Sequence, residues 1–388
     1  MKREKTWVIF TLCYLSHVSL YIARLNLTMA NGTFQKEGIA DAVQLGWLAG
    51  IFSVVYALGR LWNGRQSDIR SPRQMITTGL VTVGVCNIAF SFFPPFAAMA
   101  VLWGAGAFGQ SMLWGSFLRM FSTIYPEDVA KKRASLLSSA VAAGSVTGIL
   151  VNSFIIAHFG VRYAFILPGC LTILLAVPVL WQTRGVTPPQ RTVQSGLRDV
   201  FRDRQIRRVL LPGLIHGVMK DNVSFWMAVF VADRFGLDLK SSAYYILLVP
   251  LVGLGGRLIY PTLYRASGYR EYLITAAAFG GCAVACLPLI FGGGVPIAAV
   301  ICMSLVYAFT SMINVTFLSI LPVGYASRGS VATVSGVMDF VSYMGAGIGS
   351  AVYGYVVAGA GYMPMFLSWG VLSVLSLVIL LPMIKKKS

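Results

Sequence analysis

Long apolar segments follow one another along this 388-residue chain, and this succession limits it to folds that a lipid bilayer can hold. Most segments reach about 20 residues, the length at which a helix crosses the hydrocarbon core. Because backbone groups in lipid must hydrogen-bond within the protein, we predict that these segments are helices. Twelve are expected, at about residues 7–31, 45–63, 74–93, 96–124, 134–157, 163–182, 209–235, 241–263, 270–291, 295–320, 330–357 and 363–384. The predicted fold class is an all-α polytopic membrane protein.

The charge of the chain fits this interpretation. A net charge of +18 in a soluble protein would suggest a nucleic-acid partner, but only 11% of the residues are charged and 57% are hydrophobic. The predicted segments on one side of the membrane hold 22 of the 31 Lys and Arg residues, and those on the other side hold four. This bias is typical of cytoplasmic segments. We predict a multi-pass protein of the plasma (inner) membrane, with both termini cytoplasmic and no nucleic-acid partner.

The segment 7–31 contains a charged residue, Arg24, well inside the predicted span. An isolated charge at that depth costs at least roughly 2.5–3.5 kcal/mol, so Arg24 faces protein or water and is a candidate functional residue. His17, Tyr21 and Arg24 follow helical spacing and share one face of the segment. We expect this polar stripe to contact a substrate inside the protein.

The second half of the chain repeats features of the first. Gly59-Arg60-Leu61 recurs as Gly256-Arg257-Leu258, and Arg24 has a counterpart in Lys220 after a nearly equal interval. An internal repeat of this kind is typical of transporters built from two related bundles. We predict an N-terminal six-helix half at residues 1–182, a cytoplasmic linker at 183–208 and a C-terminal six-helix half at 209–388.

Other polar residues within the apolar segments extend the candidate site. His216 precedes Lys220 by one turn and Asp221 follows it, while Asp339 is an acid in the segment 330–357. A carboxylate at that depth needs a cation, a proton or water, so Asp339 and Asp221 are candidates for charge pairing or ion coupling. If Asp339 pairs with Lys220, an arriving anion competes for the same cation. The predicted substrate-binding residues are Arg24, Lys220, Tyr21, His17, Gln110, His216, Tyr307 and Asn314.

Other features of the sequence disfavour an enzyme or a metalloprotein. The six cysteines all lie within apolar segments and lack the spacing of metal ligands. The chain has no Gly-x-x-x-x-Gly-Lys-Ser/Thr loop, and its residues suggest no nucleophile–base–acid set. We expect no catalytic residues, no cofactor and no metal, and transport driven by a gradient or by exchange.

The pair Gly144 and Gly148 predicts close packing of the segment 134–157.

Across nearly its whole length the chain resembles the organophosphate:phosphate antiporter family, a branch of the major facilitator superfamily. The similarity rests on Tyr21-Ile22-Ala23-Arg24-Leu25-Asn26, on Ser67-Asp68 with Pro72-Arg73, on Gln110, Trp114, Gly115 and Arg119, and on Ser335-Gly336 with Tyr343-Met344-Gly345. The resemblance implies a central site in which one cation from each half binds a phosphate. It places these cations at Arg24 and at Lys220, where the family has Arg. It also implies that Asp68, with Arg65 and Arg119, is a conformational latch.

We therefore expect a secondary active transporter of a small organic anion. The first expectation is a phosphorylated metabolite exchanged for inorganic phosphate by alternating access, carried by a monomer in the lipid bilayer. One alternative is a proton-coupled symporter of carboxylates or other organic anions, with Asp339 or His17 as the proton carrier. The other is a membrane sensor of sugar phosphates that binds substrate without accumulating it and uses the linker 183–208 to dock a partner.

Overall fold

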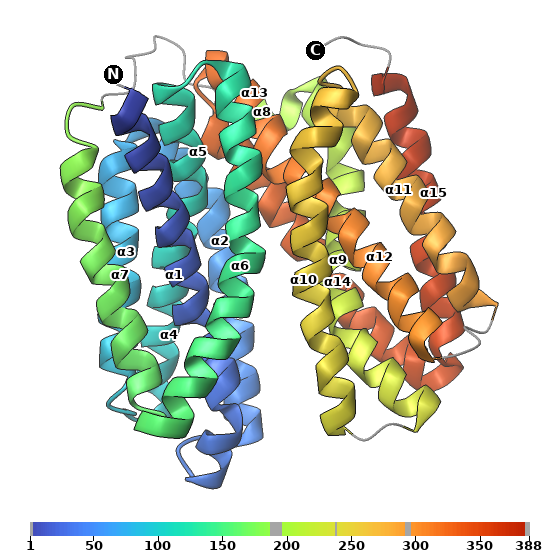
Figure 1. Cartoon of the computed structure of the whole chain (residues 1–388), viewed down its shortest axis with the longest axis horizontal. Coiled ribbons are helices and arrows are strands. Elements are labelled where there is room, and N and C mark those ends of the chain that lie inside the picture. The colour runs from blue at the N-terminus through green and yellow to red at the C-terminus, as the bar shows by residue number, and fades with distance from the viewer. Residues whose placement is uncertain (1–2, 187–195, 237–238, 292–295, 385–388) are drawn as a thin grey trace. The chain divides into compact units, whose positions relative to one another are not determined.

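The computed structural model describes residues 3–186, 196–236, 239–291 and 296–384, so residues 187–195 of the predicted linker lie outside the described part. Figure 1 shows long helices joined by short connections. Within the described residues the chain forms helices and no strands. The predicted all-α polytopic class is confirmed.

The first helices are α1 (Arg3–Lys36), α2 (Ala42–Ile69), α3 (Pro72–Phe90), α4 (Phe96–Ser111), α5 (Leu113–Ile124), α6 (Glu127–Phe159) and α7 (Tyr163–Gln182). Local sequence signals set several of their ends. Asp41 caps α2 by accepting the Gln44 N–H at 2.7 Å, and Gln44 returns a bond to the Asp41 N–H. Pro72 opens α3, where its missing N–H costs nothing. The predicted helix 96–124 is interrupted at Met112, which separates α4 from α5.

The later helices begin with the short α8 (Leu197–Arg202), which lies in the predicted linker. Then follow α9 (Arg204–Phe235), α10 (Leu239–Ala266), α11 (Glu271–Ile290) and α12 (Pro296–Val315). A π-helical turn at Thr316–Ile320 leads into α13 (Leu321–Gly324), and a 3-10 turn at Ala326–Arg328 precedes α14 (Val331–Ala360) and α15 (Tyr362–Ile384). The C-terminal segments thus lie close to their predicted places.

Nine helical stretches are long and apolar enough to cross a membrane, counted over the described part of the chain. They comprise α1, α2, α4 with α5, α6, α7, α11, α12 with its extension to Gly324, α14 and α15. The helices α3, α9 and α10 occupy the other three predicted segments. The total of twelve spans therefore stays a prediction.

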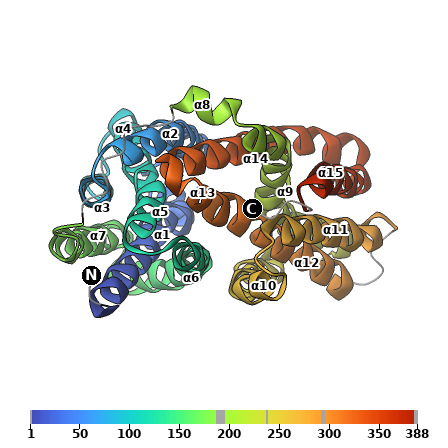
Figure 2. The same cartoon turned by 90° about the horizontal axis from the view of Figure 1, so that it is seen from above.

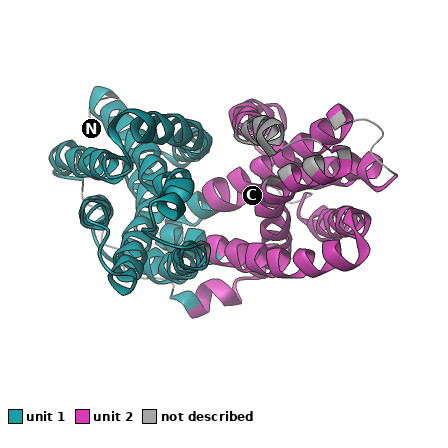
Figure 3. Cartoon of the chain, turned by 90° about the horizontal axis from the view of Figure 1, so that it is seen from below, with its two compact units in different colours: residues 1–197, 322–337 teal, residues 198–321, 338–388 magenta. Residues whose placement is uncertain are grey.

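The chain divides into two compact units, coloured separately in Figure 3. The first contains Met1–Leu197 and Pro322–Val337, and the second contains Arg198–Leu321 and Met338–Ser388. These units differ from the predicted halves at one place, because Pro322–Val337 packs with the first unit. The residues Val323 and Val331 explain this, since both are fully buried in the hydrophobic core of α1, α3, α5 and α6. The functional halves 1–182 and 209–388 stay a prediction.

Within the first unit, α1 packs along α6 and α7, as Figure 2 shows from above. Gly144 and Gly148 make this contact possible. A Cβ atom at Gly144 would lie 2.7 Å from the Cβ of Tyr21, and one at Gly148 would lie 3.1 Å from the carbonyl oxygen of Tyr21. Asn152 secures the same contact by donating to the Ile22 carbonyl at 2.8 Å. The predicted close packing of this segment is confirmed, and it sets the position of the α1 face that carries Arg24.

Within the second unit, α11 packs against α12 and α15, and α9 packs against α10, α12 and α15. Buried hydrogen bonds near Tyr260 also hold this unit together. The Tyr260 hydroxyl lies 2.7 Å from the Thr316 Oγ1, and the Thr275 hydroxyl contacts the same oxygen at 2.8 Å. These bonds satisfy polar groups that burial would otherwise penalise. They join α10, α11 and the π-helical turn beside the candidate residues of α9 and α12.

Candidate functional site

Arg24 lies among aromatic rings of α1 and α2. Its guanidinium carbon is 4.5 Å from the ring centroid of Phe52, 5.6 Å from that of Tyr56 and 5.9 Å from that of Tyr21. Phe52 and Tyr56 stack with their centroids 5.9 Å apart. The faces of such rings attract a cation, so they orient the guanidinium. The sequence analysis identified Tyr21 and missed Phe52 and Tyr56. Their i, i+4 spacing, which places both rings on one face of the second apolar segment, was an available signal.

A cavity of about 10 Å³, room for about one water molecule, adjoins Arg24 and Gln110. Gln110 is buried on α4. His17 is buried one turn before Tyr21, with its ring 5.5 Å from that of Tyr21 and 5.0 Å from that of Trp114. Trp114 itself follows Gln110 by one helical turn. The structure thus brings the four substrate-binding residues predicted in the first half, His17, Tyr21, Arg24 and Gln110, into one neighbourhood.

Lys220, on α9 in the second unit, forms an ion pair and hydrogen bond with Oδ1 of Asp221. Its Nζ also lies 5.7 Å from the ring centroid of Tyr343 on α14. The side chain of Lys220 is 17% exposed and that of Asp221 is 42% exposed, so the pair sits at the edge of buried and accessible space. Asp339 is buried on α14. Its pairing with Lys220 stays a prediction.

The other candidates of the second unit are His216, Tyr307 and Asn314. His216 is buried, with Nε2 3.2 Å from the Thr310 carbonyl and Nδ1 3.3 Å from the Ser342 hydroxyl. These contacts engage both ring nitrogens and tie α9 to α12 and α14. Tyr307 lies against Gly253 of α10, and Asn314 is buried two turns later on α12. Their contact with substrate stays a prediction.

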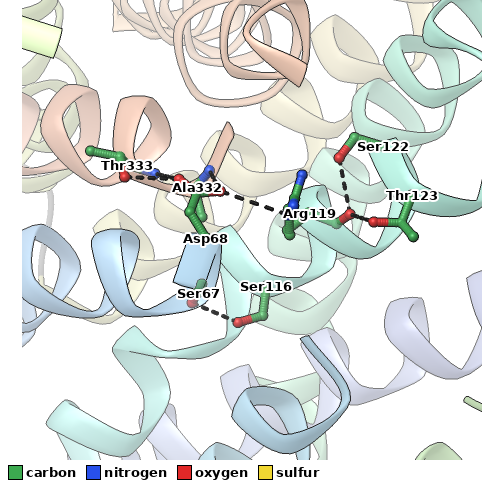
Figure 4. A network of polar contacts seen from close by, with 8 residues as sticks. All are labelled: Ser67, Asp68, Ser116, Arg119, Ser122, Thr123, Ala332 and Thr333. Carbon is green, nitrogen blue, oxygen red and sulfur yellow. Dashed lines mark hydrogen bonds and ion pairs between the residues drawn. The ribbon is translucent and has the colours of Figure 1, made fainter. Parts of the chain in front are cut away.

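Asp68, near the end of α2, has both carboxylate oxygens engaged, as Figure 4 shows. Oδ1 accepts the Ala332 N–H at 3.0 Å, and Oδ2 accepts the Thr333 N–H at 2.7 Å and its hydroxyl at 2.8 Å. The Arg119 Nε lies 4.0 Å from Oδ1. The two amides belong to the first turn of α14, where N–H groups lack helical partners and the helix dipole favours an anion.

This network contains two of the three residues predicted for the latch. Arg65, the third, lies partly buried three positions before Asp68 on α2. The sequence analysis missed Ala332 and Thr333. Their place at the start of an apolar segment, directly after Gly329-Ser330, was the signal for a helix N-terminus.

Arg60 is a second buried link between α2 and α14 that the sequence analysis did not single out. It is 0% exposed and donates to the Ser111 carbonyl at 3.2 Å and to the Ser335 hydroxyl at 3.0 Å. The backbones of the two helices are in contact beside it. A Cβ at Gly336 would overlap the Arg60 carbonyl oxygen, and one at Gly64 would lie 2.7 Å from the Ala332 carbonyl oxygen.

These features define a class of protein: a multi-pass helical membrane protein with buried cations and a polar network at the helix ends. The sequence model of the Major Facilitator Superfamily matches residues 13–350. The chain belongs to this superfamily, which confirms the superfamily resemblance seen in the sequence. The superfamily consists of transporters rather than enzymes, and the solved neighbours of this chain are transporters too.

Curated relatives are similar at low identity. The membrane sensor protein UhpC of Escherichia coli is 27% identical over 173 residues, which cover 44% of this chain and 39% of UhpC. A probable hexose phosphate transport protein of Chlamydia muridarum is 25% identical over 176 residues, which cover 45% of this chain and 39% of that protein. Both matches therefore span well under half of the relatives' length. A crystal structure of the human organic anion transporter MFSD10 superposes with a TM-score of 0.81 and 17% identity, covering 98% of this chain and 100% of that one, and shares its fold.

Proposed function

We propose that this protein is a secondary active transporter that carries a small organic anion by alternating access. The observation that carries this proposal is Arg24, a cation inside a membrane helix, oriented by Tyr21, Phe52 and Tyr56. A charge at that position is costly and is retained where a ligand or a pathway requires it. A guanidinium can present paired N–H donors to a carboxylate or a phosphate.

We assign the cargo first to phosphorylated metabolites, exchanged for inorganic phosphate. The name of one relative, a probable hexose phosphate transport protein, supports this class. In this proposal Arg24 and Lys220 bind the anion from the two halves, and His17, Tyr21, Gln110, Tyr307 and Asn314 contact the rest of the molecule. His216 supports Lys220 through its contacts with α12 and α14.

One observation favours the second candidate, a proton-coupled symporter of carboxylates. Lys220 is already paired with Asp221, so the second cation is partly neutralised. A site with less positive charge suits a monoanion better than a phosphate dianion. Asp339, buried in α14, would carry the proton. A third candidate is a membrane sensor, because the name of UhpC describes one.

The orientation follows from the charge bias along the chain. We propose that both termini and the linker 183–208 lie in the cytoplasm of the inner membrane, and that the transporter is a monomer. The Asp68 network then lies at the cytoplasmic end of α2. There it acts as the latch that holds one conformation until the cargo binds.

A ligand screen followed by a flux measurement tests the proposal. Purified full-length protein is melted in the presence of sugar phosphates, glycerol phosphate, inorganic phosphate and small carboxylates. A ligand at a hundredfold excess over its Kd raises the unfolding free energy by about 2.7 kcal/mol. The best ligand is then offered to proteoliposomes. Accumulation or counterflow supports transport, binding without flux identifies a sensor, and the lack of any anionic ligand refutes the proposal.

A further inference from the structure

A groove of about 450 Å³ opens on the surface of the first unit between α2, α3 and α4. It is separate from the candidate substrate site, since Arg24, His17 and Gln110 do not line it. Gln66, Arg70, Gln74 and Thr78 form its polar walls, and all four are exposed or partly exposed.

The depth of the groove points to the headgroup layer of the membrane. It lies on both sides of the turn between α2, which ends at Ile69, and α3, which begins at Pro72. Its deepest polar residues, Asn63 and Thr78, are each about six residues from that turn, or about 9 Å along the helix. The polar layer of each leaflet is roughly 5–8 Å thick, so the groove reaches from it to the edge of the hydrocarbon.

The exposed Trp62 gives independent support for this depth. It forms one wall of the groove and is 60% exposed. Tryptophan is enriched at the boundary between headgroups and acyl chains, where its ring is apolar and its N–H is polar. The lining also contains the apolar Met75 and Phe108 beside Asn63. A ligand with a polar end and a hydrocarbon end suits this mixed lining.

The charge of the groove selects among such ligands. Arg70 is the one cation among the nine residues that line it in the described structure, and none of the nine is acidic. A guanidinium with neighbouring amides and a hydroxyl suits a phosphodiester with a polyol headgroup. A choline headgroup would instead bring a second cation towards Arg70.

We propose that this groove binds the headgroup of an anionic phospholipid. Arg70 contacts the phosphate, Gln66 and Gln74 contact the hydroxyls of the headgroup, Thr78 contacts an ester oxygen deeper in the lipid, and the first part of an acyl chain lies along Phe108. Asn63 holds the floor in place by donating to the Ser111 hydroxyl at 2.8 Å. A bound lipid therefore braces the end of α2 that carries Asp68.

Native mass spectrometry of the purified full-length protein tests this proposal, with phosphatidylglycerol and phosphatidylcholine as the probes. We expect tighter binding of phosphatidylglycerol, weakened about tenfold or more by Arg70→Gln, since a charged hydrogen bond is lost. Gln74→Leu, at the exposed rim, should weaken it by a smaller factor. The matched control is Arg73→Gln, which removes the same charge from the same turn. Arg73 donates to the Leu180 carbonyl at 2.9 Å and does not line the groove, so its loss should leave binding unchanged.

Three results would overturn the proposal. An equal loss of binding in Arg70→Gln and Arg73→Gln would assign the attraction to the charge of the whole turn. Equal binding of the two lipids would reject an anionic headgroup. Displacement of phosphatidylglycerol by free glycerol phosphate would make the groove a site for soluble anions. Melting curves in lipid-free detergent verify that each variant is folded. If Arg70→Gln is not folded, the loss of phosphatidylglycerol binding in Gln74→Leu tests the proposal instead.

Discussion

The guanidinium of Arg24 is surrounded by aromatic rings, whereas the ammonium of Lys220 is held by a carboxylate. A ring face attracts a cation without presenting an oxygen that competes with an incoming anion. The carboxylate of Asp221 does compete, because it offers Lys220 the same kind of acceptor as a substrate would. At the residue scale, therefore, the carboxylate of Asp221 is expected to reduce the contribution of Lys220 to anion binding.

Replacing Arg24 with Ala should abolish measurable substrate binding while leaving the protein folded. Truncating one member of a charged contact costs about 2–5 kcal/mol, which is roughly thirtyfold to several thousandfold in affinity. The thermal-shift response to the ligand found in the screen measures the loss. Arg162→Ala is the matched control, since Arg162 also contacts an aromatic ring, Phe92 at 4.8 Å, but lies exposed in the turn before α7. Normal transport by Arg24→Ala would exclude Arg24 from the site.

Replacing Asp221 with Asn should strengthen the binding of phosphate dianions. The change keeps the size of the side chain and removes the charge that neutralises Lys220. We expect roughly fivefold tighter binding of the phosphate ligand at pH 8, because a partly exposed ion pair contributes about 1 kcal/mol. Asp233→Asn, at an exposed position of the same helix, is the control. Weaker binding in Asp221→Asn would mean that the carboxylate itself contacts the cargo.

At the scale of the elements, the contact of α2 with the start of α14 stands out. Gly64 and Gly336 bring the two backbones together, Arg60 links α2 to Ser335, and Asp68 accepts the first amides of α14. Buried charges and N-terminal amides satisfy each other there. Such a close-packed contact has a single geometry. We therefore expect that a small change in one of these residues weakens all of its interactions together.

A Gly336→Ala substitution should disrupt this contact by adding one methyl group. The new Cβ would overlap the Arg60 carbonyl oxygen, and backbone cannot move aside as a side chain can. We expect a lower melting temperature, corresponding to about 1–3 kcal/mol of overpacking. Gly347→Ala in the same helix is the control, because nothing lies within 4 Å of its Cβ position. Equal melting temperatures of the two variants would contradict the close contact.

Asp68→Asn should slow transport without removing substrate binding. An asparagine amide would keep one acceptor oxygen but place its NH2 donors opposite the Ala332 or the Thr333 N–H group, and the attraction to Arg119 would be lost. Uptake into proteoliposomes and ligand affinity are measured side by side. Glu127→Gln removes a carboxylate that is 53% exposed from an ion pair with Lys131 and should change neither uptake nor affinity. Should affinity and rate fall by the same factor in Asp68→Asn, the latch role is wrong.

At the scale of the whole molecule, the helix α14 contributes residues to both compact units. The boundary runs through α14 between Val337 and Met338, so the helix that begins beside Asp68 continues into the unit that contains Lys220. Asp339 lies just beyond this boundary.

An Asp339→Asn variant separates the transport modes in one reconstitution. If the cycle is exchange and Asp339 holds Lys220 ready, counterflow slows while binding is kept or improved. If Asp339 carries a proton, counterflow persists and uptake driven by a pH gradient is lost. Unchanged counterflow and unchanged uphill uptake, with a lower melting temperature, would assign Asp339 to packing and reject both roles. Val337→Ala, at a nearby buried position of α14, controls for packing alone.

The sequence by itself determined the class of the protein and the positions of its helices. The reason is physical: a span must be apolar over about 20 residues, and that demand is written locally in the chain. Local chemistry also predicted the close packing at Gly144 and Gly148. The sequence singled out Arg24 and Lys220 because charges are rare in such segments, and the family resemblance singled out Asp68.

Only the tertiary structure decided which partners these residues have. Phe52 and Tyr56 reach Arg24 from another helix, and Asp68 accepts amides from Ala332 and Thr333, more than 260 residues later in the chain. Which helices adjoin, and how each is rotated about its axis, depends on packing over the whole unit rather than on any local pattern. The sequence therefore shows which helical segments contain charges, while the packing of the helices determines the partners of each charge.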